Sequence, residues 1–457
     1  MPLGFCCFLF IILKTCDLDN NSEYSYIKSF IIFILHDNIN TKLMKKTKSK
    51  SKRYIRLADK YKRLFIVVAI GVVGSILLLT TKASPFTTSF EPEANAPSDM
   101  IVSASTASGG RNIKFKDNKP QDTSTFTLVS VPDTQAEVQS QGAYPRFTNR
   151  IQWLISNKDK LNIKYVLQVG DLQDWDDATH SHYERASSGL KLLEQAKVPY
   201  ALSVGNHDTS AVCAGGSACP GISVPTAFRE IPTWDKYYPP SRFPGIKTLC
   251  DEFNTYSSRL MAVGPSGTGL QTPSYVRDQC NKRNSTSSAY RTFTAGGVKW
   301  LIINYEMWPR QVVQEWMKSV IERHPDHNVI LFSHMHLNGN SSNLTTDFGG
   351  YGSPQGSPKA VYDNVISQYS NVKFTFNGHT GGSGCATFTG KKGNKIYSYL
   401  NNRLSSSPTP NHVRLIKINV SDKSFTSEEY VPQNGTYLNQ SQNASSTCSG
   451  INIDWVK

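Results

Sequence analysis

The chain has 457 residues, an apolar content of 39% and a formal net charge of +14. This length can hold more than one domain, and the composition is typical of a globular protein and not of a disordered one. The charge is concentrated, because residues 44–63 carry ten Lys or Arg and one Asp. Since the rest of the chain is nearly balanced, we predict no nucleic-acid partner.

An apolar segment follows the basic one. Residues 64–81 form an uncharged run of eighteen residues closed by Lys82. This run is near the lower limit for a membrane-spanning helix and longer than the core of most cleaved signals. The positive-inside rule places the basic residues 44–63 in the cytoplasm. We therefore expect residues 64–81 to anchor the chain in a membrane, or to be a signal that is cleaved for secretion. Either way, we expect the domain to lie outside the cytoplasm.

The segments on either side of this region are polar. Residues 1–43 hold two short apolar runs in Asn-rich sequence, and two lysines follow Met44, as at the start of many export signals. We expect Met44 to be the initiator and residues 1–43 to be a non-native upstream extension. Residues 82–122 have the composition of a flexible linker. At the other end, residues 432–457 are expected to form a polar tail that frays.

Six cysteines follow the apolar segment. An even number in an exported domain predicts three disulfides, for which fifteen pairings exist. Cys213 and Cys219 flank a Gly-rich loop and are expected to pair, and Cys250 with Cys280 is the next plausible pair. The alternative is that the cysteines are free buried thiols.

Residues 123–431 alternate between strand and helix patterns. Strands are predicted at 126–129, 165–169, 200–204, 290–293, 299–304, 329–331, 372–376, 395–400, 413–420 and 424–431. Helices are predicted at 144–160, 183–197, 306–323 and 358–369. Residues 209–288 interrupt this alternation as an insertion rich in Gly, Pro, Tyr and Cys. Its aromatic cluster at 234–238 is expected either to pack locally or to line a substrate cleft.

Five polar motifs stand at the ends of predicted strands. They are Asp133-Thr134-Gln135, Gly170-Asp171-Leu172-Gln173-Asp174, Gly205-Asn206-His207-Asp208, Ser333-His334 and Asn377-Gly378-His379. Parallel strands joined by helices bring such residues to one edge of a sheet. Carboxylate, amide oxygen and imidazole are ligands for a divalent metal.

In this order the motifs resemble those of the calcineurin-like metallophosphoesterases, whose pattern is D-x-H, G-D-x-x-D, G-N-H-[DE], H and G-H-x-H. The resemblance covers about two thirds of the chain. It implies a β-sandwich flanked by helices and the hydrolysis of phosphomonoesters or phosphodiesters. The alternation of strands and helices alone would equally suit a doubly wound sheet. Pro-Asp-Thr-Gln at 132–135, together with Glu306 and Pro309-Arg310, resembles an exported bacterial branch of the family, and the insertion is expected to set the substrate.

The resemblance also implies roles for single residues. Two divalent ions (Mn, Fe or Zn) would lie about 3.5–4 Å apart, neutralise the phosphoryl oxygens and lower the pKa of the attacking water. The first ion would take Asp133 and Gln135, the second Asn206, His334 and His379, and Asp171 would bridge them. His207 would be the general acid, held in its tautomer by Asp174 or Asp208.

Two positions depart from the family pattern. Gln135 stands where the family has His, and Gly381 stands where it has the last His. Both lost imidazoles would serve the first metal, so this site is expected to be weak. Glu306 or Asn401-Asn402 are candidates to replace them.

Two functions therefore remain open. The chain is either a hydrolase or a catalytically weak or inactive surface binding protein that kept the scaffold, and the intact His207 favours the hydrolase. His336 lies two residues past the matched position. The other histidines match no motif and are expected at the surface: His180, His182, His324, His327 and His412.

Overall fold

The computed structural model describes residues 101–103, 111–113, 124–253, 255–263, 272–339, 343–346, 350–402, 412–438 and 448–457. The chain divides into two units, Met1–Lys116 and Asp117–Lys457. In the first, β1 (Ile101–Ser103) pairs with β2 (Arg111–Ile113) in antiparallel fashion, within the range where a linker is predicted. The predicted segments 1–43, 44–63 and 64–81 lie outside the described residues. Within the described ranges, none of the helices combines the length and the apolar character needed to cross a membrane.

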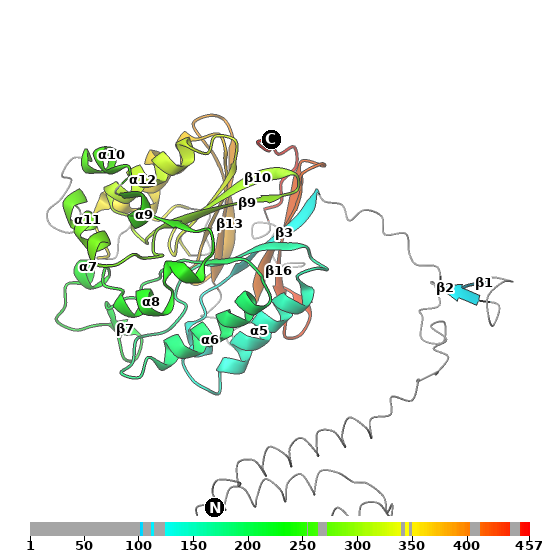
Figure 1. The fold of residues 1–457 in the computed structure, drawn as a ribbon, viewed down its shortest axis with the longest axis horizontal. Helices are drawn as coiled ribbons and strands as arrows, with labels where there is room; N and C mark the ends of the chain where they lie inside the picture. The colour runs from blue at the N-terminus through cyan, green and yellow to red at the C-terminus, as the bar shows by residue number, and fades with distance from the viewer. Residues whose placement is uncertain are drawn as a thin grey trace, which may run out of the picture. The chain divides into compact units, whose positions relative to one another are not determined.

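Two β-sheets make up the body of the second unit (Figure 1). The strands of the first sheet are β3 (Thr125–Val131), β4 (Ile163–Gln168), β5 (Tyr200–Leu202), β15 (Val413–Asn419), β16 (Ser424–Val431) and β17 (Thr436–Tyr437). Those of the second are β8 (Lys247–Thr248), β9 (Ala289–Ala295), β10 (Val298–Asn304), β11 (Asn328–Phe332), β12 (Val372–Asn377), β13 (Gly382–Thr389) and β14 (Lys395–Asn402). The first sheet has the order β17-β16-β15-β3-β4-β5, and the second the order β13-β14-β12-β11-β10-β9-β8.

Each sheet contains a set of adjacent parallel strands. In the first sheet β3, β4 and β5 run in the same direction. In the second, β10, β11, β12 and β14 do so. The carboxyl ends of the strands in each set therefore meet at one edge of their sheet, which is where parallel units place ligand groups.

A single apolar cluster joins the two sheets. Phe126 and Leu167 enter it from the first sheet, and Trp300, Phe332 and Phe374 enter it from the second. All five side chains are buried, and the ring of Trp300 meets that of Phe126 edge-on at 5.4 Å. Side chains of two sheets that share one buried layer form a sandwich, so the predicted sandwich is confirmed and the doubly wound alternative is wrong.

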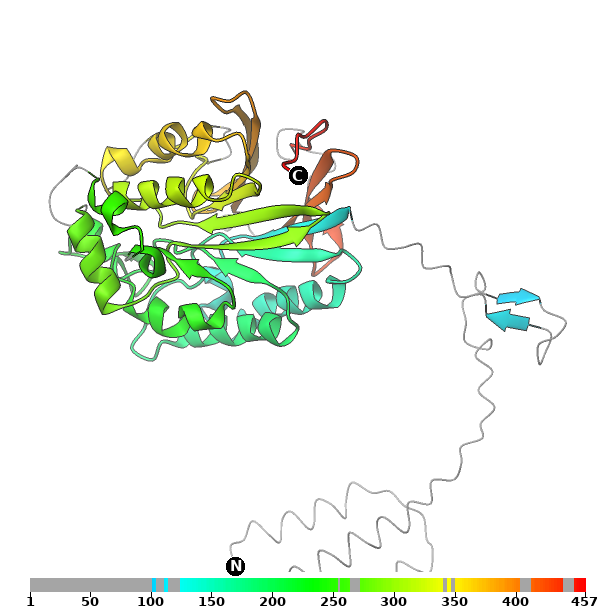
Figure 2. The same cartoon turned by 45° about the horizontal axis from the view of Figure 1, so that its top comes forward.

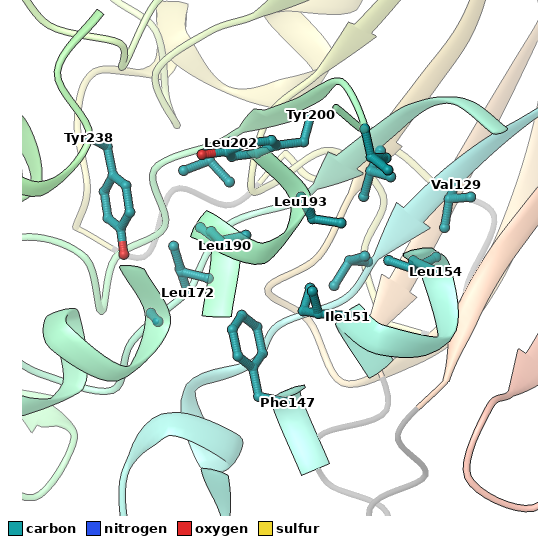
Figure 3. Close-up of a cluster of buried hydrophobic side chains, with 14 of the residues drawn as sticks. Val129, Phe147, Ile151, Leu154, Leu172, Leu190, Leu193, Tyr200, Leu202 and Tyr238 are labelled. Atoms are coloured by element: carbon teal, nitrogen blue, oxygen red, sulfur yellow. The ribbon is translucent and has the colours of Figure 1, made fainter. Parts of the chain in front are cut away.

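Helices cover the outer face of each sheet. On the first sheet lie α5 (Tyr144–Asn157) and α6 (Ser181–Gln195), and on the second lie α12 (Gln311–Glu322) and α13 (Pro358–Asn364) (Figure 2). The apolar residues of α5 recur at helical spacing, and Figure 3 shows Phe147, Ile151 and Leu154 pointing into the cluster beneath α5 and α6. The other short helices outside the insertion are α4 (Gln135–Val138), η7 (Pro354–Gly356) and η8 (Ile366–Gln368).

The predicted helix at 306–323 begins later than expected. Residues 306–310 form a loop, because Pro309 restricts the residue before it and Arg310 has extended backbone angles. The helix predicted at 358–369 likewise ends at Asn364 and continues as η8.

The insertion contains short helices and a small hairpin. It contains the hairpin of β6 (Val212–Cys213) and β7 (Ser217–Ala218), then α7 (Val224–Ala227), α8 (Pro232–Tyr237), η5 (Pro240–Arg242), α9 (Leu249–Phe253), α10 (Ser257–Met261) and α11 (Pro273–Lys282). In its aromatic cluster, Trp234 and Tyr238 are fully buried and pack against Tyr183 of α6. The burial of Trp234 and Tyr238 supports local packing, and the alternative that the cluster lines a cleft stays a prediction.

Three disulfides tie the domain together. Cys213–Cys219 and Cys250–Cys280 form as predicted, and the third joins Cys385 of β13 to Cys448. From Cys448 of the third disulfide onwards, residues 448–457 pack onto the sandwich, with Trp455 only 5% exposed. The prediction that residues 432–457 fray is therefore wrong for this segment.

Candidate metal centre

Loops from both sheets meet at the carboxyl ends of their parallel strands. Asp171 follows β4, His334 follows β11 and His379 follows β12. One ligand atom of each of these three residues lies within 4.8 Å of the others, and no other such group occurs within the described ranges. Three of the predicted metal ligands are thus brought together from distant parts of the chain.

The backbone at this site is unusual. Asp171 has φ +50° and His379 has φ +69°, a left-handed conformation that costs energy for residues other than glycine and that clusters at functional sites. The motif glycines make room for the ligands: a Cβ on Gly205 would lie 2.1 Å from Asp171 Oδ1, and a Cβ on Gly170 would lie 2.3 Å from His334 Nδ1. The Gly of each motif is therefore a requirement of close packing.

His334 is held in a defined orientation. Its Nδ1 lies 2.8 Å from the carbonyl oxygen of Val169, so the Nδ1–H donates there and Nε2 carries the lone pair. Nε2 faces Asp171 Oδ2 at 3.0 Å. The ring is buried and stands edge-on to that of His379, at a centroid distance of 5.0 Å. An imidazole fixed in this way presents its ligand atom toward Asp171.

Two amide oxygens at the site have no hydrogen-bond partner among the described residues. They are Oε1 of Gln135 and Oδ1 of Asn206, and both are buried. The amide nitrogen of Gln135 donates to Asp171 Oδ2 at 3.3 Å. Because a buried acceptor without a partner is costly, and these oxygens are predicted metal ligands, the residues fit a bound divalent ion.

The charges at the site also favour a bound cation. Asp133 and Asp171 are both buried, and no Lys or Arg forms an ion pair with either in the described part of the chain. Burial raises the pKa of Asp133, and the nearby charge of Asp171 adds to the increase. Burial also acts on Asp171, but His334 and His207 outweigh it and lower its pKa. Two buried carboxylates with this little compensation call for a cation.

His207 stands at the rim of the cluster. Its backbone N–H donates to Asp171 Oδ1 at 3.0 Å, and its Nδ1 lies 2.7 Å from the carbonyl oxygen and 3.1 Å from Oδ1 of Asp174. The side chain is 17% exposed. Burial alone would lower the pKa of His207, but Asp171 and Asp174 outweigh it and raise it to about 10. The ring is thus anchored through Nδ1 and leaves Nε2 for another group.

Asp208 does not hold the ring of His207, which was one of the two alternatives predicted for that role. Its Oδ1 accepts from the backbone N–H groups of Leu172 and Gln173, and its Oδ2 accepts from Gly205 N. The carboxylate therefore holds two of the motif loops together, and the partner of the His207 ring is Asp174.

The residues predicted to replace the lost imidazoles as metal ligands have other hydrogen-bond or ion-pair partners. Glu306 is paired with Arg310 and Arg229. Asn402 donates to Asp133 Oδ2 at 2.7 Å, and Asn401 donates to the carbonyl oxygen of Ser130 at 3.0 Å. Asn402 thus orients Asp133, a role that sequence patterns alone do not reveal. Gly381 precedes β13 and has no side chain to offer.

Other residues near the site were missed or misplaced. Tyr351, in a loop without a sequence signal, meets the ring of His379 edge-on at 5.7 Å. His336 is buried, burial lowers its pKa to about 4, and neither ring nitrogen has a hydrogen-bond partner among the described residues. The surface prediction is wrong for His182 and His412, which are both buried.

A family model described as calcineurin-like phosphoesterase matches residues 126–382. The chain is 34% identical over 98 residues to the uncharacterized protein YvnB of Bacillus subtilis, a match that covers 21% of this chain and spans 7% of that protein. Among solved structures, it is similar to a dimetal phosphatase from Danio rerio, with 11% identity, a TM-score of 0.37 and 68% of this chain and 98% of that chain covered. The purple acid phosphatase PPD1 of yellow lupin (Lupinus luteus) is similar at 11% identity and a TM-score of 0.38, over 71% of this chain and 53% of that one. Because the family model covers more than half of the sequence, the chain belongs to the calcineurin-like phosphoesterase family.

Proposed function

We propose that this protein hydrolyses phosphomonoesters or phosphodiesters outside the cytoplasm, with divalent ions at the metal centre and His207 as the proton donor. The position of His207 carries the proposal. It adjoins the ligand cluster through its hydrogen bond to Asp171, yet its ring is bound to Asp174 and not to the cluster. A protein that only bound a metal or a ligand would have no use for a proton donor placed in this way.

Each residue has a role in the reaction. When bound, the divalent ions would supply charge neutralisation at the phosphoryl oxygens and a lowered pKa for the attacking water. Asp133, Gln135, Asp171, Asn206, His334 and His379 would hold them, and the mixed donors suit Mn, Fe or Zn. Asp174 accepts from Nδ1–H and, together with Asp171, favours the protonated ring, so that the Nε2–H of the imidazolium can give its proton to the leaving-group oxygen.

The first experiment measures turnover of p-nitrophenyl phosphate and its bis ester, with and without added Mn²⁺, and determines the metal content of the same samples. The proposal predicts metal-dependent turnover of at least one ester. Bound metal without turnover above a protein-free blank would instead establish the alternative, a surface binding protein that kept the scaffold.

The second experiment tests the proton donor. His207→Ala should keep its metal and lower turnover by about 10²–10⁴-fold for esters of alkyl alcohols, as general acids typically contribute. The loss should be smaller for p-nitrophenyl esters, whose leaving group needs no proton. His180→Ala is the control, because His180 pairs with Asp176 at the surface. Equal losses on both kinds of ester would remove His207 from this role.

The location outside the cytoplasm rests on separate support. Three disulfides stabilise the domain, and disulfides persist mainly in oxidising compartments. The basic segment 44–63 and the apolar segment 64–81 supply an export signal or an anchor. Protease added to intact cells should cleave the anchored domain, or the culture medium should contain the released form; a domain found only in the cytoplasmic fraction would refute the location.

A further inference from the structure

A half-open cavity of about 60 Å³ lies between the insertion and the loop that precedes α12. Three arginines and one glutamate line it, together with Ser285 and Ser287. We call it the arginine pocket. None of the proposed metal ligands contributes to its wall. Since a water needs about 10–15 Å³ of such space, the pocket has room for roughly four to six atoms of that size.

Arg310 offers the pocket an unused donor. Its Nε donates to Glu306 Oε1 at 2.9 Å, and its Nη2 donates to Glu306 Oε2 at 2.7 Å. Its Nη1 is buried and has no hydrogen-bond partner among the described residues. The residue is only 8% exposed, so bulk water does not solvate this group freely. A charged donor left in this state is costly unless an acceptor enters the pocket.

Arg229 adds a second buried positive charge. Its Nη1 and Nη2 donate to the carbonyl oxygens of Met307 and Trp308, at 3.0 and 2.6 Å. Its Nη1 also lies 3.4 Å from Glu306 Oε2. Burial lowers the pKa of Arg229 to about 10, and the neighbouring Arg310 adds to the decrease while Glu306 opposes it. One carboxylate therefore serves two buried guanidinium groups.

The third arginine does not change this balance. Arg283 directs its Nε at Asp235, at 3.1 Å, and its Nη1 at Glu230, at 3.6 Å. Its charge is thus matched by acidic groups that do not line the pocket. The charges that remain in the pocket are those of Glu306, Arg229 and Arg310. Together they give a net charge of one positive unit in a largely apolar and desolvated wall.

We propose that the arginine pocket binds a small tetrahedral oxyanion, with inorganic phosphate as the ion that its size and charge fit. Phosphate has five heavy atoms, which the volume accommodates. Arginine binds phosphate oxygens through its planar fork of N–H donors, and Ser287 lies in the same wall. A low local dielectric strengthens these bonds. The proposal does not depend on the reaction at the metal centre.

The test counts bound phosphate. Equilibrium dialysis of radiolabelled inorganic phosphate against the metal-loaded protein gives the number of ions per chain. Gln279→Phe places a larger apolar side chain in the wall of the pocket without touching its charges, and should bind one phosphate fewer than the wild type. Asn281→Phe makes the same change at an exposed position of α11 and should leave the number unchanged. Any phosphate held at the metal centre is common to all three proteins and cancels.

A second variant tests the donor itself. Arg310→Lys keeps the charge beside Glu306 and loses the fork, so the same phosphate should bind about tenfold or more weakly. Sulfate should compete for the site, whereas phenylphosphonate should not, because the pocket has no room for its ring. Equal competition by phenylphosphonate would overturn the assignment to a free ion.

Thermal melting of each variant shows whether it is folded. If Arg310→Lys does not fold, the result of Gln279→Phe decides alone. A folded Gln279→Phe that binds as many phosphate ions as the wild type would overturn the proposal, and the pocket would then be filled by water.

Discussion

The carboxylate of Glu306 makes the stability of this fold depend on pH. Burial alone would raise the pKa of Glu306, but Arg229 and Arg310 outweigh it and lower it from 4.5 to about 2. In the unfolded chain the pKa returns to its ordinary value. Because the folded-state pKa is the lower of the two, the stabilisation is complete above about pH 4.5 and is lost as the pH falls towards 2. The shift corresponds to about 3 kcal/mol in total, of which about 2 kcal/mol is lost by pH 3.

Glu306→Gln tests this reasoning. The variant leaves two buried guanidinium groups without their counter-ion, so its free energy of unfolding at pH 6 should be about 3–5 kcal/mol below that of the wild type. Urea unfolding of both proteins at pH 6 and at pH 3 gives this difference at each pH. It should shrink by about 2 kcal/mol at pH 3, because the wild type has by then lost most of the same interaction. Groups that titrate equally in both proteins cancel in the comparison.

The control is Glu315→Gln. Glu315 pairs at the surface with Lys318 and Arg259, so its loss should cost less than about 1 kcal/mol at either pH. A difference between wild type and Glu306→Gln that is the same at pH 6 and pH 3 would refute the depressed pKa. It would also contradict the net positive charge of the arginine pocket, on which the proposed binding of phosphate rests.

Two further predictions concern the backbone and the disulfides. Gly170→Ala should displace His334, because the new Cβ would lie 2.3 Å from Nδ1, and should lower the metal content measured by elemental analysis. Gly215→Ala has a similar positive φ but nothing within 4 Å of the new Cβ, so it should keep its metal; equal losses would mean that backbone strain alone is responsible. The double variant Cys385→Ser with Cys448→Ser opens a loop of 63 residues and should lose about 4 kcal/mol of stability. A wild-type protein whose melting temperature is the same with and without reductant would contradict this prediction.

The parts of the fold that were predicted correctly depend on local patterns. Buried strands such as β4 and β11 contain short apolar runs, Tyr-Val-Leu in β4 and Val-Ile-Leu-Phe in β11, and the predicted ligands lie two or three residues past the ends of these strands. Asp171, His334 and His379 could therefore be placed together from sequence, because parallel strands bring their carboxyl ends to one edge. The structure confirms that these three residues form one cluster.

The errors arise where several partners compete for one group. Asp208 is next to His207 in sequence and Asp174 lies 33 residues earlier, but backbone N–H groups of three residues occupy the Asp208 carboxylate. Glu306 carries the right ligand chemistry, but two arginines from different elements reach it first. Such choices depend on tertiary contacts, and hydropathy patterns along the chain do not record them.

The two proposed metal positions differ in their donors. The second would take two imidazoles, His334 and His379, in addition to the proposed bridging aspartate and an amide oxygen. The first would take Asp133 and the neutral amide of Gln135, and the structure brings no further imidazole, Asp or Glu into the ligand cluster within the described ranges. Imidazole suits zinc and iron, whereas oxygen donors suit manganese or magnesium. We therefore expect the purified protein to retain about one tightly held ion and to gain activity when manganese is added.

Calorimetric titration of the metal-free protein with Mn²⁺ should then show two unequal steps. Gln135→His replaces a neutral amide with an imidazole at a position whose amide nitrogen already lies 3.3 Å from Asp171 Oδ2. The weaker step should become tighter in this variant, while the stronger step stays as it was. Gln139→His, which adds an imidazole at the exposed residue that follows α4, should change neither step. A single step with two equivalent ions in the wild type would mean that a further residue completes the first position, because Asp133, Gln135 and the bridging carboxylate alone cannot match two imidazoles for a borderline ion.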